Sequence, residues 1–203
     1  MADEDRRRWD ERHAAVIAAV RDAAAGTPAA ATAESAPPFV AANDAFLPSQ
    51  GRALDVACGR GGATVALARR GLTVFALDVS LVALSEVRRR ADAAGVARSV
   101  HTLAADLDDG LPEGLGRFDV VLCSHFHAPP LWPAFRDALA PGGVLVLETL
   151  TSRNVELGLA APSPRFLIAP GEILRAAEGL TVLLHVEDVI DGAHRARLVA
   201  RRS

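Results

Sequence analysis

The chain has 203 residues, half of them hydrophobic, and a formal net charge of −3 at pH 7. This length is enough for one domain with a buried core, and the slight acidic excess argues against a protein that binds nucleic-acid phosphates. All 22 basic residues are arginine and tyrosine is absent, which excludes a Schiff-base lysine, a Walker-type phosphate lysine and the Tyr/Lys pair of short-chain dehydrogenases.

The sequence predicts a cytoplasmic protein that has no membrane partner. No apolar run approaches 18 residues, and the charged start M-A-D-E-D-R-R-R-W-D lacks the apolar core of a secretory signal. The two cysteines, Cys58 and Cys123, form neither a disulfide framework nor a metal-ligand spacing. We therefore expect reduced thiols and no metal site.

The first 48 residues are expected to form a helix, a linker and a second short helix. Trp9 and the apolar residues after it recur at three- and four-residue steps, which predicts an amphipathic helix over residues 6–25. The low-complexity stretch 26–38 predicts a flexible linker. Residues 39–47 predict a short helix that ends at Pro48.

A strand, a glycine turn and a helix follow, over residues 53–56, 57–62 and 63–70. Glycine tolerates positive φ, and the free N–H groups of the next helix favour a ligand at such a turn. Asp55 lies inside the apolar strand, where a carboxylate is costly unless it is hydrogen-bonded. The alternative is an ordinary tight turn whose loop Asp55 caps.

A second strand, 73–77, closes on Asp78, and helix 81–94 follows. An acidic residue at this point hydrogen-bonds ribose in Rossmann-like folds. Ser80 is expected to cap the helix, which leaves Asp78 free; the alternative is that Asp78 serves only in the cap. A third strand, 100–104, runs into A-D-L-D-D.

The remaining strands complete a sheet. Residues 118–123 predict the fourth strand, and the turn Pro141-Gly142-Gly143 opens the fifth. A helix is expected to end near residue 178. Two last strands, near 181–187 and 196–200, flank a short D-G-A-H turn, which predicts an antiparallel hairpin at the sheet edge.

The strings D-V-A-C-G-R-G-G and L-A-P-G-G resemble motifs of class I S-adenosylmethionine-dependent methyltransferases, whose first motif usually has glycine where this chain has Ala57. The last third resembles most the tellurite-resistance-related subgroup, although the hairpin is short and His194-Arg195 correspond only loosely to its His-Arg pair. The resemblance implies an α/β Rossmann-like fold, with a seven-stranded, mostly parallel sheet, one antiparallel strand in a C-terminal hairpin, and helices on both faces. Residues 1–203 would then be one methyltransferase domain, with 1–48 as lid helix and linker.

The same resemblance implies S-adenosylmethionine as cofactor and S-adenosylhomocysteine as product. The turn would bind it through backbone at Ala57, Gly59 and Gly61, Asp78 would meet the ribose, and Asp106 the adenine amino group. W-D-E-R-H resembles the W-D-x-R-Y of many members, with Arg12 facing a carboxylate; the alternative is a surface helix with Trp9 packed on the core. The expected cofactor-binding residues are Trp9, Arg12, Asp55, Ala57, Cys58, Gly59, Gly61, Asp78, Val79, Asp106, Leu107, Cys123 and Ser124.

On the acceptor side, a small molecule is expected. Ligands of open α/β sheets bind beyond the carboxyl ends of strands, so His125 and His127 are the candidate catalytic bases; alternatively each closes a loop by bonding backbone. A catalytically silent cofactor-binding partner and an NAD-dependent oxidoreductase are the competing functions. The oligomeric state stays open between a monomer and a weak dimer.

Overall fold

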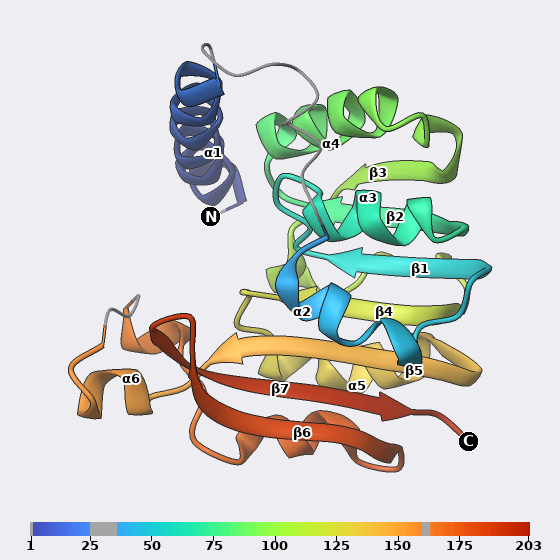
Figure 1. The fold of residues 1–203 in the computed structure, drawn as a ribbon, viewed down its shortest axis with the longest axis vertical. Helices are drawn as coiled ribbons and strands as arrows, with labels where there is room; N and C mark the ends of the chain where they lie inside the picture. Colours follow the sequence, from blue (N-terminus) through green and yellow to red (C-terminus); the bar gives the residue numbers. More distant parts are fainter. Residues whose placement is uncertain (1, 25–35, 160–162) are drawn as a thin grey trace. The chain divides into compact units, whose positions relative to one another are not determined.

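The computed structural model describes residues 2–24, 36–159 and 163–203, and within them seven strands form one sheet in the order β3-β2-β1-β4-β5-β7-β6 (Figure 1). Strand β7 pairs antiparallel with both of its neighbours, β5 and β6. The expected mostly parallel sheet with a reversed strand in a C-terminal hairpin is confirmed. The strands are β1 Gly51–Val56, β2 Leu72–Asp78, β3 Val100–Ala104, β4 Phe118–Ser124, β5 Leu139–Leu150, β6 Thr181–Ile190 and β7 Ala193–Arg201.

Helices lie around the sheet. The α-helices of the described residues are α1 Ala2–Ala24, α2 Pro38–Ala42, α3 Gly62–Arg69, α4 Leu81–Ala93, α5 Trp132–Ala138 and α6 Arg153–Glu156. None of the helices described is long and apolar enough to cross a membrane. The predicted linker, 26–38, lies mostly outside the described residues.

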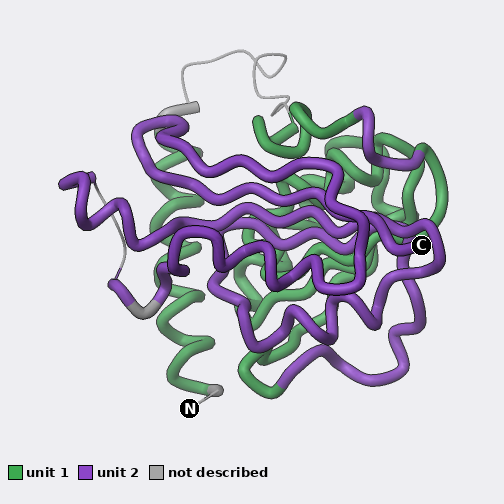
Figure 2. Tube along the Cα trace, turned by 90° about the horizontal axis from the view of Figure 1, so that it is seen from below, with its two compact units in different colours: residues 1–44, 49–109 green, residues 45–48, 110–203 purple. Residues whose placement is uncertain are grey.

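The chain divides into two compact units (Figure 2). Unit 1 comprises Met1–Asp44 and Ser49–Asp109, and unit 2 comprises Ala45–Pro48 and Gly110–Ser203.

Unit 1 brings three strand ends to one edge. The last four residues of β1 are all buried, as expected of a strand in a parallel sheet that is covered on both faces. Val56 pairs with Leu77, and Asp78 pairs with Ala104, so β1, β2 and β3 end side by side. Helix α3 packs on β1 and β2, α4 packs on β2 and β3, and α1 packs on α4.

In unit 2, the Pro141-Gly142-Gly143 segment differs from the prediction. It lies inside β5 rather than before it, because Leu139 already pairs with Phe118 and the register then shifts. A Cβ on Gly143 would lie 2.8 Å from the Phe118 carbonyl oxygen. The glycine thus allows a bulge in the strand.

In place of one helix that ends near residue 178, the structure has several short helices. The structure has α6 and the 3-10 helices Pro164–Phe166 and Glu172–Ala177. Pro164 and Pro170 lack backbone donors and interrupt a longer helix.

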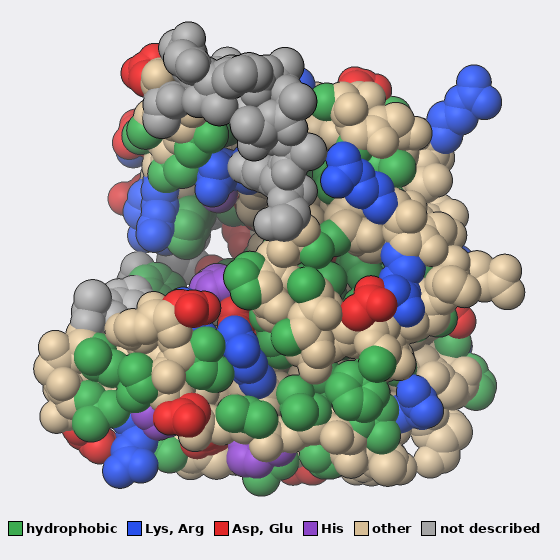
Figure 3. Space-filling view, viewed as in Figure 1, with side chains coloured by type: hydrophobic (Ala, Val, Ile, Leu, Met, Phe, Trp, Pro, Cys, Tyr) green, Lys and Arg blue, Asp and Glu red, His purple; other side chains and the backbone are tan. Residues whose placement is uncertain are grey.

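The terminal hairpin is longer than predicted. Asp191 and Gly192 have φ angles of 50° and 74°, as in a two-residue type I′ turn. Strand β6 therefore continues to Ile190, and β7 begins at Ala193. Figure 3 shows hydrophobic side chains over β6 and β7, and on the edge strand Val182 and Val186 are 45% and 37% exposed.

Candidate functional site

The turn after β1 has a backbone conformation that favours small residues. Ala57, Gly59 and Gly61 have φ angles of 53°, 52° and 79°, in the left-handed region where glycine is least strained. Gly61 N–H donates to Cys58 O over 3.0 Å, and a Cβ on Gly61 would lie 2.7 Å from Cγ2 of Val87. Glycine at position 61 is therefore required both by φ and by the close approach of α4.

Asp55 lies beneath this turn and faces inward. Its side chain is buried, and Thr64 of α3 donates to its Oδ2 over 2.6 Å. Burial raises the pKa of Asp55 to about 7; the Thr64 hydrogen bond lowers the pKa and the nearby Asp78 charge raises it. The carboxyl group thus joins the strand to the helix and keeps a proton to near-neutral pH.

Asp78 closes the turn from the end of β2. Gly59 N–H donates to its Oδ2 and Ser80 N–H donates to its Oδ1, both over 2.9 Å. Ser80 is the N-cap of α4, since its Oγ accepts from Ala83 N–H over 3.1 Å. The predicted cap at Ser80 is confirmed, and Asp78, with Val79 beside it, lies at the glycine turn.

Helix α1 is attached to the start of α4 by a carboxylate that sequence reasoning missed. Oδ1 of Asp10 accepts from Ser80 Oγ over 2.6 Å and from Val82 N–H over 3.1 Å. The two predicted cofactor residues of α1 contact each other, because the Arg12 guanidinium lies 5.0 Å from the centre of the Trp9 ring. The W-D-E-R-H string already shows Asp10 as an acidic residue next to Trp9, which is the sequence feature that could have indicated this contact.

His13 is a second residue of α1 that lies close to the glycine turn. Its Cε1 lies 3.7 Å from where a Cβ on Gly59 would stand, so the imidazole lies beside the glycine turn. Burial lowers the pKa of His13, Asp78 opposes this effect, and Arg60 and Arg12 add to it. The ring is therefore neutral near pH 7.

Asp106 and Leu107 lie at the same edge of unit 1. Ala105 N–H donates to Asp78 O over 3.1 Å, which brings the segment after β3 to the end of β2. Oδ1 of Asp106 accepts from Asp108 N–H over 3.0 Å, and Leu107 is buried. Asp106 therefore shapes its own loop and keeps a second carboxylate oxygen.

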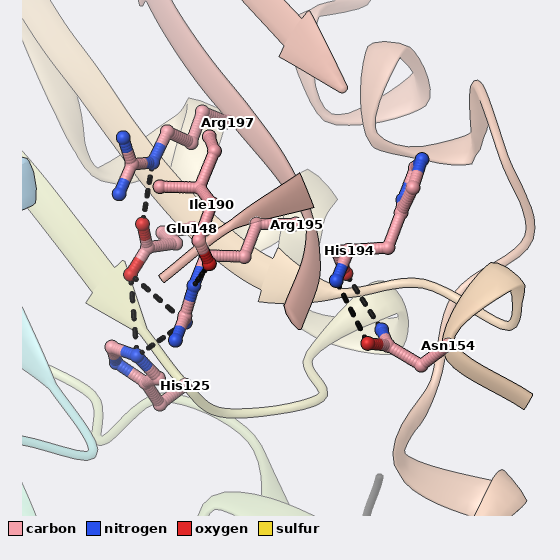
Figure 4. Close-up of polar contacts among 7 residues, drawn as sticks. All are labelled: His125, Glu148, Asn154, Ile190, His194, Arg195 and Arg197. Atoms are coloured by element: carbon pink, nitrogen blue, oxygen red, sulfur yellow. Dashed lines mark hydrogen bonds and ion pairs between the residues drawn. The ribbon is translucent and has the colours of Figure 1, made fainter. Parts of the chain in front are cut away.

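In unit 2, the end of β4 meets a buried carboxylate (Figure 4). Nε2 of His125 lies 3.2 Å from Oε1 of Glu148, and Arg197 Nε donates to Oε2 over 2.5 Å. Arg195 Nη1 lies 2.8 Å from the same His125 Nε2. Ser124 pairs with Glu148 in the sheet. Glu148 could have been found from the sequence, because it is an acidic residue within the apolar string L-V-L-E-T, as Asp55 is within its strand.

Nε2 of His125 lies between a donor and an acceptor. The Arg195 guanidinium can only donate to this nitrogen, whereas the Glu148 carboxylate can only accept from it. Burial lowers the pKa of His125, Glu148 opposes this, and the charges of Arg195 and Arg197 lower it further. The side chain is nevertheless 57% exposed, so a ligand can reach it.

His127 stands in the chain between Phe126 and Ala128, which line a pocket together with Glu148. Burial lowers its pKa, and Glu172 raises it. The pocket is lined by Cys123, Phe126 and Trp132 among others. Phe126 and Trp132 thus supply aromatic side chains to the wall of this pocket.

The neighbouring residues His194 and Arg195 point to different surroundings, because successive side chains of a strand alternate. His194 is buried, with Nδ1 2.8 Å from Thr151 Oγ1, and its backbone N–H donates to Asn154 Oδ1 over 2.8 Å. Figure 4 shows the two clusters apart. Of this pair, only Arg195 joins the histidine after β4.

Comparisons with known proteins agree with this geometry. Residues 53–143 match a family described as a methyltransferase domain. The ubiquinone biosynthesis O-methyltransferase of Xanthomonas axonopodis pv. citri (strain 306) is 30% identical over 125 residues, which are 59% of this chain and 52% of that protein. This chain spans about half the length of the curated relatives it matches.

Solved structures of low sequence identity share the fold. TehB from Haemophilus influenzae has a TM-score of 0.66 and 16% identity, over 85% of this chain and 63% of that one. Magnesium protoporphyrin IX methyltransferase (ChlM) from Synechocystis PCC 6803, with bound SAH, has a TM-score of 0.62 and 17% identity, over 81% of this chain and 79% of that one. Taken with the domain match and the glycine turn, these findings support a class I S-adenosylmethionine-dependent methyltransferase.

Proposed function

We propose that the protein transfers the methyl group of S-adenosylmethionine to a small-molecule acceptor. The observation that carries the proposal is the left-handed turn between β1 and α3, with the Asp78 carboxylate hydrogen-bonded to its Gly59 N–H. The methyltransferase-domain match over residues 53–143 includes this turn. The ubiquinone biosynthesis O-methyltransferase among its relatives supports a small molecule as acceptor.

The chemistry of unit 1 fits this cofactor. Left-handed backbone at Gly59 and Gly61 lets a ligand approach the main chain closely. A carboxylate has about four acceptor positions, so Asp78 keeps capacity for ribose hydroxyls beside its two N–H bonds. Asp106 is the candidate for the adenine amino group, and Leu107 for contact with the ring. Asp55 supports the turn from below through Thr64.

When bound, the cofactor supplies an electrophilic methyl group on a sulfonium ion. The residues of the chain then orient the acceptor and, if it is neutral, take its proton. His125 and His127 are the candidate bases, because their lowered pKa keeps both imidazoles neutral near pH 7. His127 is the stronger candidate, since Arg195 engages Nε2 of His125.

One observation favours a second candidate, a cofactor-binding protein without catalysis. In the structure Nε2 of His125 contacts both the Arg195 guanidinium and the Glu148 carboxylate, so groups of the chain itself engage this nitrogen. Turnover measurements separate the two candidates.

The cofactor is tested by thermal unfolding with S-adenosylmethionine, S-adenosylhomocysteine and NAD. A ligand at one hundred times its Kd stabilises the folded state by about 2.7 kcal/mol, which raises the midpoint by roughly 5–10 °C for a chain of this size. We expect such shifts with the two adenosyl-sulfur ligands and none with NAD. A shift with NAD alone would assign an oxidoreductase instead.

Catalysis is tested by screening acceptors with a labelled methyl group. We expect transfer to a small molecule, and His127→Ala should lower turnover while the affinity for S-adenosylhomocysteine stays the same. Tight binding with no transfer to any acceptor in a broad screen would favour the silent binder. Normal turnover in His125→Ala, in His127→Ala and in the double variant would show that neither histidine acts as a base. Catalysis would then come from positioning the acceptor against the methyl group alone.

A further inference from the structure

Arg60, within the glycine turn, carries a buried nitrogen without a partner. Among the described residues, its Nη1 is fully buried and makes no hydrogen bond. Leaving a buried donor unpaired costs free energy, and more so on a charged group. Such atoms are rare in folded proteins, so this one requires an explanation, such as a bound ligand.

The guanidinium lies where a ligand of the turn would meet it. Its charge contributes to lowering the pKa of His13, whose ring stands beside Gly59. Arg60 therefore lies close to both the turn and α1. All of these residues belong to unit 1.

The carboxylates near His13 bond to other donors. Asp78 accepts from two backbone N–H groups of the turn and of the start of α4. Asp10 accepts from the Ser80 hydroxyl and from Val82 N–H. Neither hydrogen-bonds to Nη1 of Arg60, so an acceptor for that nitrogen has to come from elsewhere.

We propose that Arg60 binds the carboxylate of the methionyl part of S-adenosylmethionine. The planar guanidinium suits a carboxylate, which it can meet with two parallel hydrogen bonds. This assignment rests on the proposed function and replaces Arg12, the carboxylate residue that the W-D-E-R-H string predicts. Arg12 is exposed and lies over the face of Trp9. Its guanidinium group therefore has no buried, unpaired donor that a carboxylate would satisfy.

The test combines a truncated ligand with a truncated side chain. S-adenosylhomocysteine has the amino-acid carboxylate, whereas methylthioadenosine keeps the adenosyl thioether and lacks that part. Calorimetry measures both ligands on the wild type, Arg60→Gln, Arg12→Gln and Arg69→Gln. Arg69 is the matched control, because it is an exposed arginine at the end of α3, the helix that follows the turn.

Arg60→Gln should lower the affinity for S-adenosylhomocysteine by about tenfold to a hundredfold, the usual range for hydrogen bonds to a charged group. Its affinity for methylthioadenosine should stay within about twofold, which also reports an intact turn. Without ligand, Arg60→Gln should unfold at or above the wild-type temperature, because a buried unpaired donor is removed. Arg69→Gln should change neither affinity.

Other results overturn the assignment. The assignment is contradicted, while the proposed function stands, if the wild type and Arg60→Gln bind S-adenosylhomocysteine equally well. It is also contradicted if Arg60→Gln loses affinity for both ligands equally, or if only Arg12→Gln loses affinity for S-adenosylhomocysteine selectively. A wild type that binds neither ligand would overturn the proposed function and this assignment together. If Arg60→Gln does not fold, Arg60→Lys serves instead. It keeps the charge without the planar fork and should lose affinity for S-adenosylhomocysteine alone.

Discussion

At the scale of single residues, the proton on Asp55 makes stability depend on pH. Its folded-state pKa of about 7 lies above the ordinary value of about 3.9, so the folded state keeps a proton that the unfolded chain releases. The stability from this group is fully present below about pH 4 and is lost as pH rises through about 7. Asp55→Asn removes the titration, so its unfolding midpoint should fall less than that of the wild type between pH 5 and pH 8.

Urea unfolding at several pH values measures this difference. Asp92→Asn is the control, because Asp92 is exposed near the end of α4 and its replacement should leave the wild-type pH profile unchanged. Parallel profiles for the wild type and Asp55→Asn would show that the buried carboxyl group is ionised in the folded state throughout this range.

Gly61 combines a left-handed backbone with a close neighbour. Its φ is 79°, and a Cβ would lie 2.7 Å from Cγ2 of Val87. Gly61→Ala should therefore lower the free energy of unfolding by about 2–5 kcal/mol, from backbone strain and overpacking together. Gly95→Ala is the matched control, with a similar φ of 72° and nothing within 4 Å of the added Cβ, and should cost only about 1–2 kcal/mol.

A second variant separates the two causes in Gly61→Ala. Val87→Ala removes the methyl groups that the new Cβ meets, so the double variant should recover part of the loss relative to the sum of the single variants. Additive losses would show that the contact with α4 is not what makes glycine necessary there. Equilibrium urea unfolding measures all four proteins.

At the scale of elements, α1 is attached to α4 through Asp10. The carboxylate accepts from the hydroxyl and a backbone N–H at the start of α4, where the helix dipole favours a negative charge. Asp10→Ala should increase amide hydrogen exchange along α1 and leave β1 to β3 protected. Asp22→Ala, at an exposed position of the same helix, is the control, and equal exchange in both variants would contradict the attachment.

At the scale of the whole molecule, residues far apart in the sequence meet at Glu148. His125, Arg195 and Arg197 all contact its buried carboxylate. Glu148→Gln removes the negative charge that faces two guanidinium groups and should lower the free energy of unfolding by about 3–5 kcal/mol. Glu178→Gln, which breaks a pair whose carboxylate is 67% exposed, should cost under about 1 kcal/mol. A similar small loss in both variants, measured by urea unfolding, would contradict a structural role for the cluster.

The sequence alone determined the features whose signals lie within a few residues. The strand, glycine turn and helix around Asp55, the cap at Ser80 and the strand Val100–Ala104 were all predicted from local residues. These features depend on φ preferences, capping and hydrophobic pattern, which neighbouring residues set. The resemblance carried by the same turn also implied the sheet topology.

Only the tertiary structure decided which distant side chains meet. Asp10 and Ser80 lie 70 positions apart, as do His125 and Arg195, and no local pattern pairs them. The register between β4 and β5 turned the Pro141-Gly142-Gly143 segment into a bulge within a strand. The partners of His125, Glu148 and Arg195, follow from strand pairing and packing, which depend on the whole chain.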